Sequence, residues 1–161
     1  RPSEHLLSQD PPPPLGAVHV QANRDGRAAC LALTEHLCTQ LALASEDVQA
    51  VRLAVEEACS NVVDHGYAGL PPGPFSLTFR LAGEDVLEAQ VCVQAPPFHP
   101  DEAGQPDLLS DSDDRPIGGL GWFFIKQVMT EVLYTSQDGG NCLSLRRKLS
   151  APLPSLDRGV A

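Results

Sequence analysis

The sequence predicts a two-layer α/β sandwich of the α+β type, with helices on one face of a mostly antiparallel mixed sheet. Strand patterns follow one another across short turns, which favours antiparallel pairing, and two long helical patterns are adjacent in the chain. Neither a G-x-G-x-x-G motif after the first strand nor a P-loop occurs, so a Rossmann or P-loop nucleotide fold is not indicated.

Each element is predicted from the period of its apolar residues, which is two in strands and between three and four in helices. The expected elements are a strand at 15–22, helices at 24–43 and 46–65, strands at 75–82 and 86–94, a long loop at 95–117, a helix from 118 to near 129, and strands at 132–135 and 142–149. Ser45 is the expected N-cap of the second helix. Residues 1–14 are expected to form a flexible leader, 15–149 the domain, and 150–161 a flexible tail.

Composition limits the classes of partner. The 161 residues, 42% of them hydrophobic, are enough for a single globular core. The formal net charge of −10 argues against duplex DNA or an anionic membrane as the main partner, because both need a basic surface. No apolar run reaches the roughly 20 residues that a membrane-spanning helix needs. We therefore expect neither a nucleic-acid nor a membrane partner.

The chain has five cysteines: Cys30, Cys38, Cys59, Cys92 and Cys142. Their number is odd, and no two of them form a C-x-x-C pair. Buried, reduced thiols are therefore expected, rather than disulfides or a zinc site, and they indicate a cytoplasmic protein.

The stretch from Val51 to Tyr67 carries two stripes of side chains. Apolar residues at spacings of three and four form a core face. Glu57, Asn61 and His65 recur every four residues, which places a carboxylate, an amide and an imidazole along another face. Taken alone, this column is better explained as an ordinary solvated face, because every amphipathic helix has a polar side.

Four residues, Gly118 to Gly121 (GGLG), open the apolar helix that follows the long loop. Glycines at a helix N-terminus allow phosphate oxygens to approach free backbone N–H groups, although glycines also serve plain turns. The acidic residues between Asp101 and Asp114 in the loop are better explained as a solvated segment than as a metal site.

Together, E-x-x-x-N-x-x-x-H-G on one helix, two strands, a long loop and GGLG resemble the GHKL (histidine-kinase-like) ATPase superfamily. Within it, the chain is most similar to the anti-sigma-factor serine/threonine kinases of bacterial partner-switching systems. The stretches that carry the resemblance are LAVEEACSNVVDHGY, APPFHPDEA, DRPIGGLGWFFIKQVMTEVLY and DGGNCLSLRRKL. The resemblance covers about 15–149 and implies a Bergerat-type ATP-binding fold with ATP and Mg²⁺ as cofactors.

The resemblance also implies roles for individual residues. Glu57 matches the general base that takes a proton from an attacking serine hydroxyl, and Asn61 matches the Mg²⁺ ligand. His65 matches a residue that lines the site. Arg115 lies where a cation near the γ-phosphate is expected. The glycine-box positions expected to contact nucleotide are Val93, Gln94 and Ala95 in the first box and Gly118, Gly119, Leu120 and Gly121 in the second.

The first glycine box departs from the family pattern D-x-G, because it reads Val93-Gln94-Ala95 here. Val93 cannot accept the hydrogen bond that the family's Asp takes from the adenine amino group, and Ala95 lacks the backbone freedom of glycine. An unpaired adenine amino group costs about 1–3 kcal/mol, which is roughly a tenfold to hundredfold loss of affinity. The Gln94 amide oxygen or a bridging water could replace the missing acceptor.

Three functions follow as hypotheses. The first is a protein serine kinase that uses Mg-ATP to phosphorylate a STAS-type anti-sigma-factor antagonist and that sequesters a sigma factor or other effector, with a homodimer implied by the resemblance alone. The second is a non-enzymatic protein-binding switch with impaired nucleotide binding. The third, the ATPase part of a sensor histidine kinase, is disfavoured, because we expect no phosphoacceptor hairpin within residues 1–23.

Overall fold

The computed structural model of the chain describes residues 13–67, 70–94, 119–137, 140–151 and 153, and the elements and contacts below are those of these residues. In chain order the elements are β1 (Gly16–Gln21), α2 (Arg24–Gln40), α3 (Ser45–Asn61), the π-helical turn η1 (Val62–Gly66), β2 (Pro74–Gly83), β3 (Val86–Val93), α4 (Gly119–Val128), β4 (Glu131–Gln137) and β5 (Gly140–Lys148). The predicted strands and helices are confirmed, with ends that shift by a few residues.

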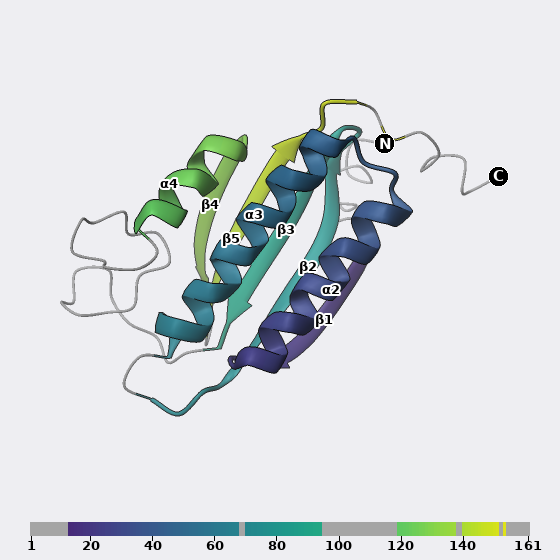
Figure 1. The fold of residues 1–161 in the computed structure, drawn as a ribbon. Helices are drawn as coiled ribbons and strands as arrows, with labels where there is room; N and C mark the ends of the chain where they lie inside the picture. Colours follow the sequence, from purple (N-terminus) through teal and green to yellow (C-terminus); the bar gives the residue numbers. More distant parts are fainter. Residues whose placement is uncertain (1–12, 68–69, 95–118, 138–139, 152, 154–161) are drawn as a thin grey trace, which may run out of the picture.

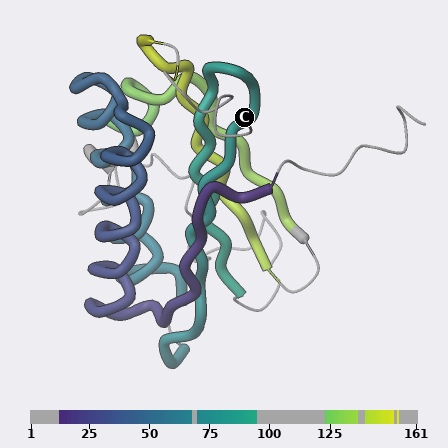
Figure 2. The backbone as a smooth tube through the Cα atoms, turned by 90° about the vertical axis from the view of Figure 1, so that its right-hand side faces the viewer, coloured from purple at the N-terminus to yellow at the C-terminus, as the bar shows by residue number. Residues whose placement is uncertain are grey.

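The strands form one sheet in the order β1-β2-β3-β5-β4, and every neighbouring pair is antiparallel. The three α-helices lie on the same face of this sheet (Figure 1). Seen from the side, the helices and the sheet form two layers (Figure 2). The predicted two-layer α+β architecture is therefore confirmed.

The core fills the space between the two layers. Strand residues that point toward the helices alternate with polar residues, as in Phe75, Leu77 and Phe79 on β2, all of which are buried. The apolar stripe of α3, which includes Val51 and Val55, is buried against them. Burial of this apolar surface is the main favourable contribution to folding, and it holds α3 above the middle of the sheet.

The start of α3 differs from the prediction. Ser45 is the first helical residue, and the N-cap is Ala44, whose backbone is extended and whose side chain makes no capping hydrogen bond. By contrast, α2 has a side-chain cap, because Asn23 Oδ1 accepts a hydrogen bond from Gly26 N at 2.8 Å. The prediction of Ser45 as N-cap is therefore wrong. The helix begins at Ser45 itself, one residue before the predicted start at Glu46.

The end of α3 also differs from the prediction. The α-helix ends at Asn61, and Val62–Gly66 continues as the π-helical turn η1. A π turn has more than four residues per turn, so His65 does not stack directly above Asn61. Of the predicted column, only Glu57 and Asn61 therefore lie one above the other on the same helix face, and His65 does not continue it.

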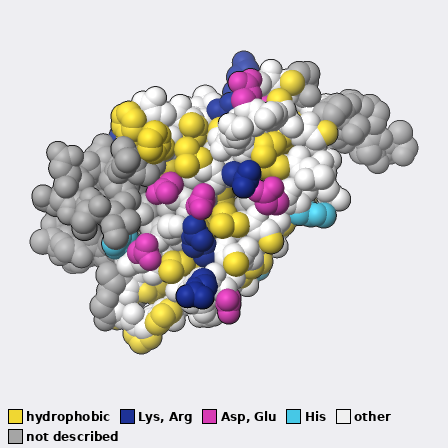
Figure 3. All heavy atoms as spheres, viewed as in Figure 1, with side chains coloured by type: hydrophobic (Ala, Val, Ile, Leu, Met, Phe, Trp, Pro, Cys, Tyr) yellow, Lys and Arg dark blue, Asp and Glu magenta, His cyan; other side chains and the backbone are white. Residues whose placement is uncertain are grey.

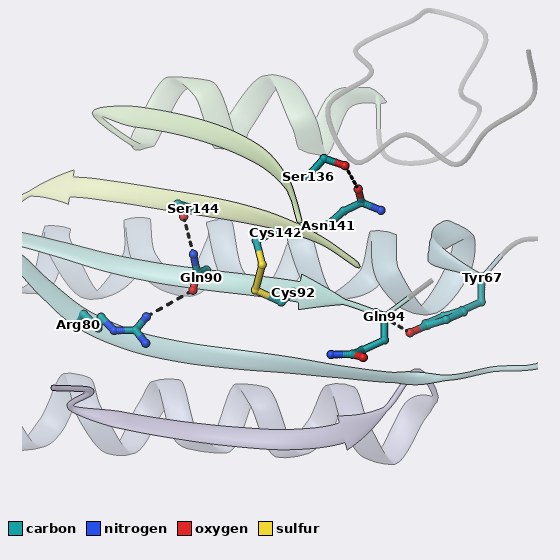
Figure 4. The surroundings of a disulfide bond; sticks show 9 residues. All are labelled: Tyr67, Arg80, Gln90, Cys92, Gln94, Ser136, Asn141, Cys142 and Ser144. Atoms are coloured by element: carbon teal, nitrogen blue, oxygen red, sulfur yellow. Dashed lines mark hydrogen bonds between the residues drawn. A yellow bond between two sulfur atoms is a disulfide. The ribbon is translucent and has the colours of Figure 1, made fainter. Parts of the chain in front are cut away.

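Two of the cysteines are bonded to each other. Cys92 on β3 and Cys142 on β5 lie directly opposite in the sheet and form a disulfide (Figure 4). The other three cysteines, Cys30, Cys38 and Cys59, are free and buried. The prediction of five reduced thiols is therefore wrong for this pair. The spacing of the cysteines in the sequence could not reveal this disulfide, because only the register between β3 and β5 places the two Cβ atoms side by side.

Candidate nucleotide site

The C-terminal end of α3, the turn η1, the last residues of β3 and the first turn of α4 gather at one end of the molecule (Figure 1). Helix α4 packs beside α3 on the sheet. Segments that carry the predicted site residues and are far apart in the sequence therefore meet here. The sheet order explains the meeting, because β3 lies at its centre and α3 runs above it.

Glu57 and Asn61 lie one turn apart near the end of α3. Their preceding neighbours, Glu56 and Ser60, face α2, because Arg27 donates to Glu56 Oε2 at 3.0 Å and to Ser60 Oγ at 2.8 Å. Glu57 and Asn61 each follow one of these two residues in the chain. Their side chains are therefore rotated about the helix axis, away from the direction in which Glu56 and Ser60 point toward α2. Glu57 is half-buried and takes part in an interaction.

The Asn61 side chain is buried, with only 4% of the residue exposed. No hydrogen bond of its amide to another described residue is seen. A buried amide normally has a partner, because desolvation without one costs about 1–3 kcal/mol. The Asn61 amide atoms are not among the fully buried, unpartnered side-chain atoms of the described residues. The amide oxygen is therefore available to coordinate a ligand.

The turn η1 places the imidazole of His65 in this region, and its backbone lies close to the end of β3. His65 Nε2 is buried and has no hydrogen-bond partner among the residues described. A Cβ atom on Gly66 would lie 3.3 Å from Val62 Cγ1 and 3.8 Å from Val93 Cγ1, so the turn lies against the end of β3. Val93 itself is buried in the core.

Tyr67 fixes the segment that follows η1 (Figure 4). Its hydroxyl accepts a hydrogen bond from Gln94 N at 3.0 Å and donates one to the carbonyl oxygen of Pro74. Burial raises the pKa of Tyr67, and the Gln94 N–H opposes that shift. The ring therefore links the end of α3 to the start of β2 and the end of β3.

Asn141 is a buried polar residue that the sequence analysis did not single out. It lies on β5 directly opposite Val93, and Ser136 Oγ on β4 donates a hydrogen bond to its Oδ1 at 2.8 Å (Figure 4). One signal was present in the sequence: residues 141, 143, 145 and 147 share one face of the alternating strand, and Asn141 is a polar residue beside the apolar Leu143 and Leu145.

The second glycine box is only partly described. Gly119, Leu120 and Gly121 form the start of α4, as predicted, so their backbone N–H groups belong to the first helical turn. Gly118, Ala95, Arg115 and the whole of the acidic loop lie outside the described residues. The structure thus brings Glu57, Asn61, Val93 and the start of α4 to one end of the fold.

The helix face of the molecule carries charges of both signs (Figure 3). Arg27 pairs with Glu56, and Arg52 pairs with Glu35. Apolar side chains gather over α4, where Phe123 and Phe124 are exposed (Figure 3). Within the described ranges, no group of three or more His, Cys, Asp or Glu side chains could hold a metal ion. None of the described helices is long and apolar enough to cross a membrane.

Comparisons with known proteins agree on the family. The family model of the histidine kinase-like ATPase domain matches residues 21–147. The serine-protein kinase RsbW of Halalkalibacterium halodurans is 33% identical over 117 residues, which cover 70% of this chain and 70% of that protein. The RsbW of Bacillus velezensis is 35% identical over 98 residues, which cover 58% of this chain and 61% of that protein.

A solved structure supports the fold. The crystal structure of the RsbU and RsbW domains of a Mycobacterium tuberculosis protein aligns with a TM-score of 0.59 at 20% identity, covering 86% of this chain and 34% of that one. The chain belongs to the histidine kinase-like (GHKL) ATPase family, in the branch that contains the serine-protein kinases RsbW.

Proposed function

We propose that the chain is a Mg-ATP-dependent protein serine kinase of a partner-switching system. The observation that carries this proposal is Asn61, a buried residue whose amide makes no hydrogen bond to another described residue and which lies one turn beyond Glu57. A neutral amide oxygen suits the hard Mg²⁺ ion, because it coordinates the ion without adding negative charge beside a triphosphate. Similarity to the RsbW serine-protein kinases supports the same reading.

Each residue of the site has a distinct proposed role. Asn61 would hold the Mg²⁺ ion, which, when bound, neutralises charge on the transferring phosphoryl group. The N–H groups at the start of α4 would contact the phosphates, aided by the positive end of the helix dipole. Glu57 would accept the proton of the substrate serine hydroxyl. His65 would line the site, and Arg115 would approach the γ-phosphate.

The proposed substrate is a serine on a STAS-type anti-sigma-factor antagonist. The chain would also sequester a sigma factor or another effector, in the cytoplasm and as a homodimer. These partners rest on similarity to the RsbW proteins, of which the aligned segments span 70% in the Halalkalibacterium and 61% in the Bacillus relative.

The test combines binding and phosphoryl transfer. Isothermal titration of the whole chain with ATP should show binding that needs Mg²⁺, and radiolabelled ATP should transfer phosphate to the cognate antagonist. Glu57→Gln should retain binding and lose transfer by a factor of about 10² or more. Asn61→Ala should lose Mg²⁺-dependent binding. Glu56→Gln is the matched control, because Glu56 is the adjacent acid but faces Arg27 on α2.

A second candidate is a protein-binding switch that does not bind nucleotide. The buried, apolar Val93 favours it, because this position cannot accept a hydrogen bond from adenine. The same titration separates the two candidates. If no binding occurs at millimolar nucleotide with Mg²⁺, the proposal of a kinase is rejected and the proposal of a protein-binding switch is retained.

A further inference from the structure

The disulfide between Cys92 and Cys142 lies directly beside the candidate nucleotide site. Cys92 precedes Val93 on β3 and Cys142 follows Asn141 on β5, so the bonded pair is the last but one of the β3–β5 ladder. Val93 faces the helices as part of the core. Because successive strand residues point to opposite faces, the two sulfur atoms lie on the sheet face opposite the three α-helices (Figure 2).

A small thiol can reach the disulfide from that face. The cross-strand neighbours of the bonded pair have short side chains: Ser76 lies beside Cys92, and Thr135 lies beside Cys142. Cys92 is half-buried, and 8% of Cys142 is exposed, whereas the free thiol of Cys30 belongs to a residue with no exposed surface. Cys92 is therefore the sulfur atom that a thiol reagent meets first.

Strand β5 is held at its two ends by different bonds. At the end away from the site, Arg147 donates a hydrogen bond to the carboxylate of Asp47 on α3 at 2.8 Å. At the site end, the disulfide joins β5 to β3. The edge strand β4 follows β5 in the sheet order, so the same bond also holds β4 to the centre of the sheet at this end. Cleavage of the disulfide should therefore loosen the site end and leave the other end in place.

The paired strands end immediately after the disulfide. Gln94 follows the last pair of the ladder, and its N–H bonds to the Tyr67 hydroxyl at 3.0 Å. The start of β5 lies against the end of β3, because a Cβ atom on Gly140 would collide with the Val93 carbonyl oxygen. Strand ends open more easily than strand centres. The bond at Cys92 limits this opening one residue away from Val93.

Resting on the proposed function, we infer that the Cys92–Cys142 disulfide is a thiol-exchange site that controls the affinity for nucleotide. With the bond intact, β3 and β5 are held in the closed arrangement that binds Mg-ATP. With the bond reduced, the strand ends also populate open arrangements, and the apparent affinity falls in proportion to the closed fraction. In the reducing compartment that the proposed function implies, disulfides are mostly transient or redox-sensing, which supports this role.

The reductant is a dithiol. One of its thiolates attacks Cys92 Sγ and forms a mixed disulfide, while Cys142 leaves as a thiolate and takes up a proton. The second thiol of the reagent then attacks the mixed disulfide, which releases Cys92 as a thiol and the reagent as its own cyclic disulfide. Two electrons pass from the reagent to the protein, and exchange with an oxidised dithiol reverses the step.

The experiment compares the oxidised and the reduced form of the whole chain. Isothermal titration with ATP and Mg²⁺ before and after treatment with dithiothreitol should show about tenfold weaker binding by the reduced form, which corresponds to a closed fraction of about one tenth. Hydrogen exchange followed by NMR should become faster at the end of β3 and the start of β5. Exchange near Leu87, which lies opposite Arg147, should not change.

Two variants show whether this bond is responsible. Cys92→Ser/Cys142→Ser should bind ATP as weakly as the reduced wild type and should not respond to dithiothreitol. Cys38→Ala is the matched control, because it removes a free, buried thiol of α2 and should keep the full response. Circular dichroism should show that the reduced chain and both variants remain folded.

The outcomes separate this inference from the proposed function. Equal ATP affinity of the oxidised and reduced forms, or a response to dithiothreitol that persists in the double variant, overturns the inference and leaves the nucleotide site intact. Unfolding of the whole chain on reduction also overturns it, because the inference requires a local opening. If neither form binds ATP, the inference and the proposed function fail together.

Discussion

Arg147 and Asp47 are separated by 100 positions in the chain, yet Arg147 Nε donates a hydrogen bond to Asp47 Oδ1 at 2.8 Å. The Asp47 side chain is 1% exposed and also accepts hydrogen bonds from the backbone N–H and the hydroxyl of Ser150. Arg147 Nη1 donates to the carbonyl oxygen of Val128 at 2.6 Å. This ion pair, between a buried carboxylate and a guanidinium that is 18% exposed, therefore joins the first turn of α3, the end of α4 and the end of β5.

Removal of one partner of this ion pair should destabilise the fold strongly. Asp47→Ala leaves the Arg147 guanidinium without its counter-charge, and we expect the free energy of unfolding to fall by about 3–5 kcal/mol. Urea denaturation measures the change. Glu46→Ala is the control, because Glu46 is exposed in the same helical turn and should change stability by less than about 0.5 kcal/mol. Similar losses for both variants would contradict the prediction.

Loss of the Tyr67 hydroxyl should loosen the end of β3. Tyr67→Phe leaves the Gln94 N–H and the Pro74 carbonyl without their side-chain partner, which should cost about 1–3 kcal/mol. Hydrogen exchange followed by NMR should show faster exchange at the Gln94 amide, with little change at the centre of β3. Unchanged exchange at Gln94 would show that the hydroxyl does not hold this segment.

The disulfide between Cys92 and Cys142 should stabilise the fold. It closes a loop with a sequence separation of 50, so its loss should lower the free energy of unfolding by about 2–4 kcal/mol. In denaturant without reductant, a thiol assay should count three free cysteines, and after reduction it should count all five. The double variant Cys92→Ala/Cys142→Ala should have a melting temperature that does not respond to reductant. Five reactive thiols before reduction would exclude the bond.

Because of Cys38, the free energy of unfolding should depend on pH in the alkaline range. Burial, followed by the nearby Glu35 carboxylate, raises the pKa of the Cys38 thiol to about 11 from the usual value of 9.0. Above pH 9 the unfolded chain releases this proton while the folded chain retains it. The free energy of unfolding should therefore fall by about 1.4 kcal/mol per pH unit between pH 9 and 11, with no further loss from this group above 11.

The matched variant for this effect is Cys38→Ala. It should remove that part of the slope between pH 9 and 11 in urea denaturation. Iodoacetamide at pH 8 should leave Cys38 unmodified in the folded protein, because the neutral thiol is a poor nucleophile, and should modify it in denaturant. Rapid modification of Cys38 in the folded protein would contradict a buried, protonated thiol.

Local patterns in the sequence were enough to predict most of the fold. The period-two patterns at 75–82 and 86–94 correspond to β2 and β3, and the glycines before the apolar helix correspond to the first turn of α4. These predictions succeed because strand and helix periods depend on neighbouring residues. The predictions of Ser45 as N-cap and of an α-helix that continues to His65 were wrong. Caps and π turns depend on the local path of the backbone, which is decided by packing.

The sequence by itself determined the α+β class, the position of Glu57 and Asn61 one turn apart, and the resemblance to a nucleotide-binding family. The tertiary structure alone decided which distant residues meet: Cys92 with Cys142, Asp47 with Arg147, and Val93 with Asn141. The physical reason is strand register. A shift of one residue between β3 and β5 would move every side chain of β5 to the other face, and no local pattern in either strand specifies that alignment.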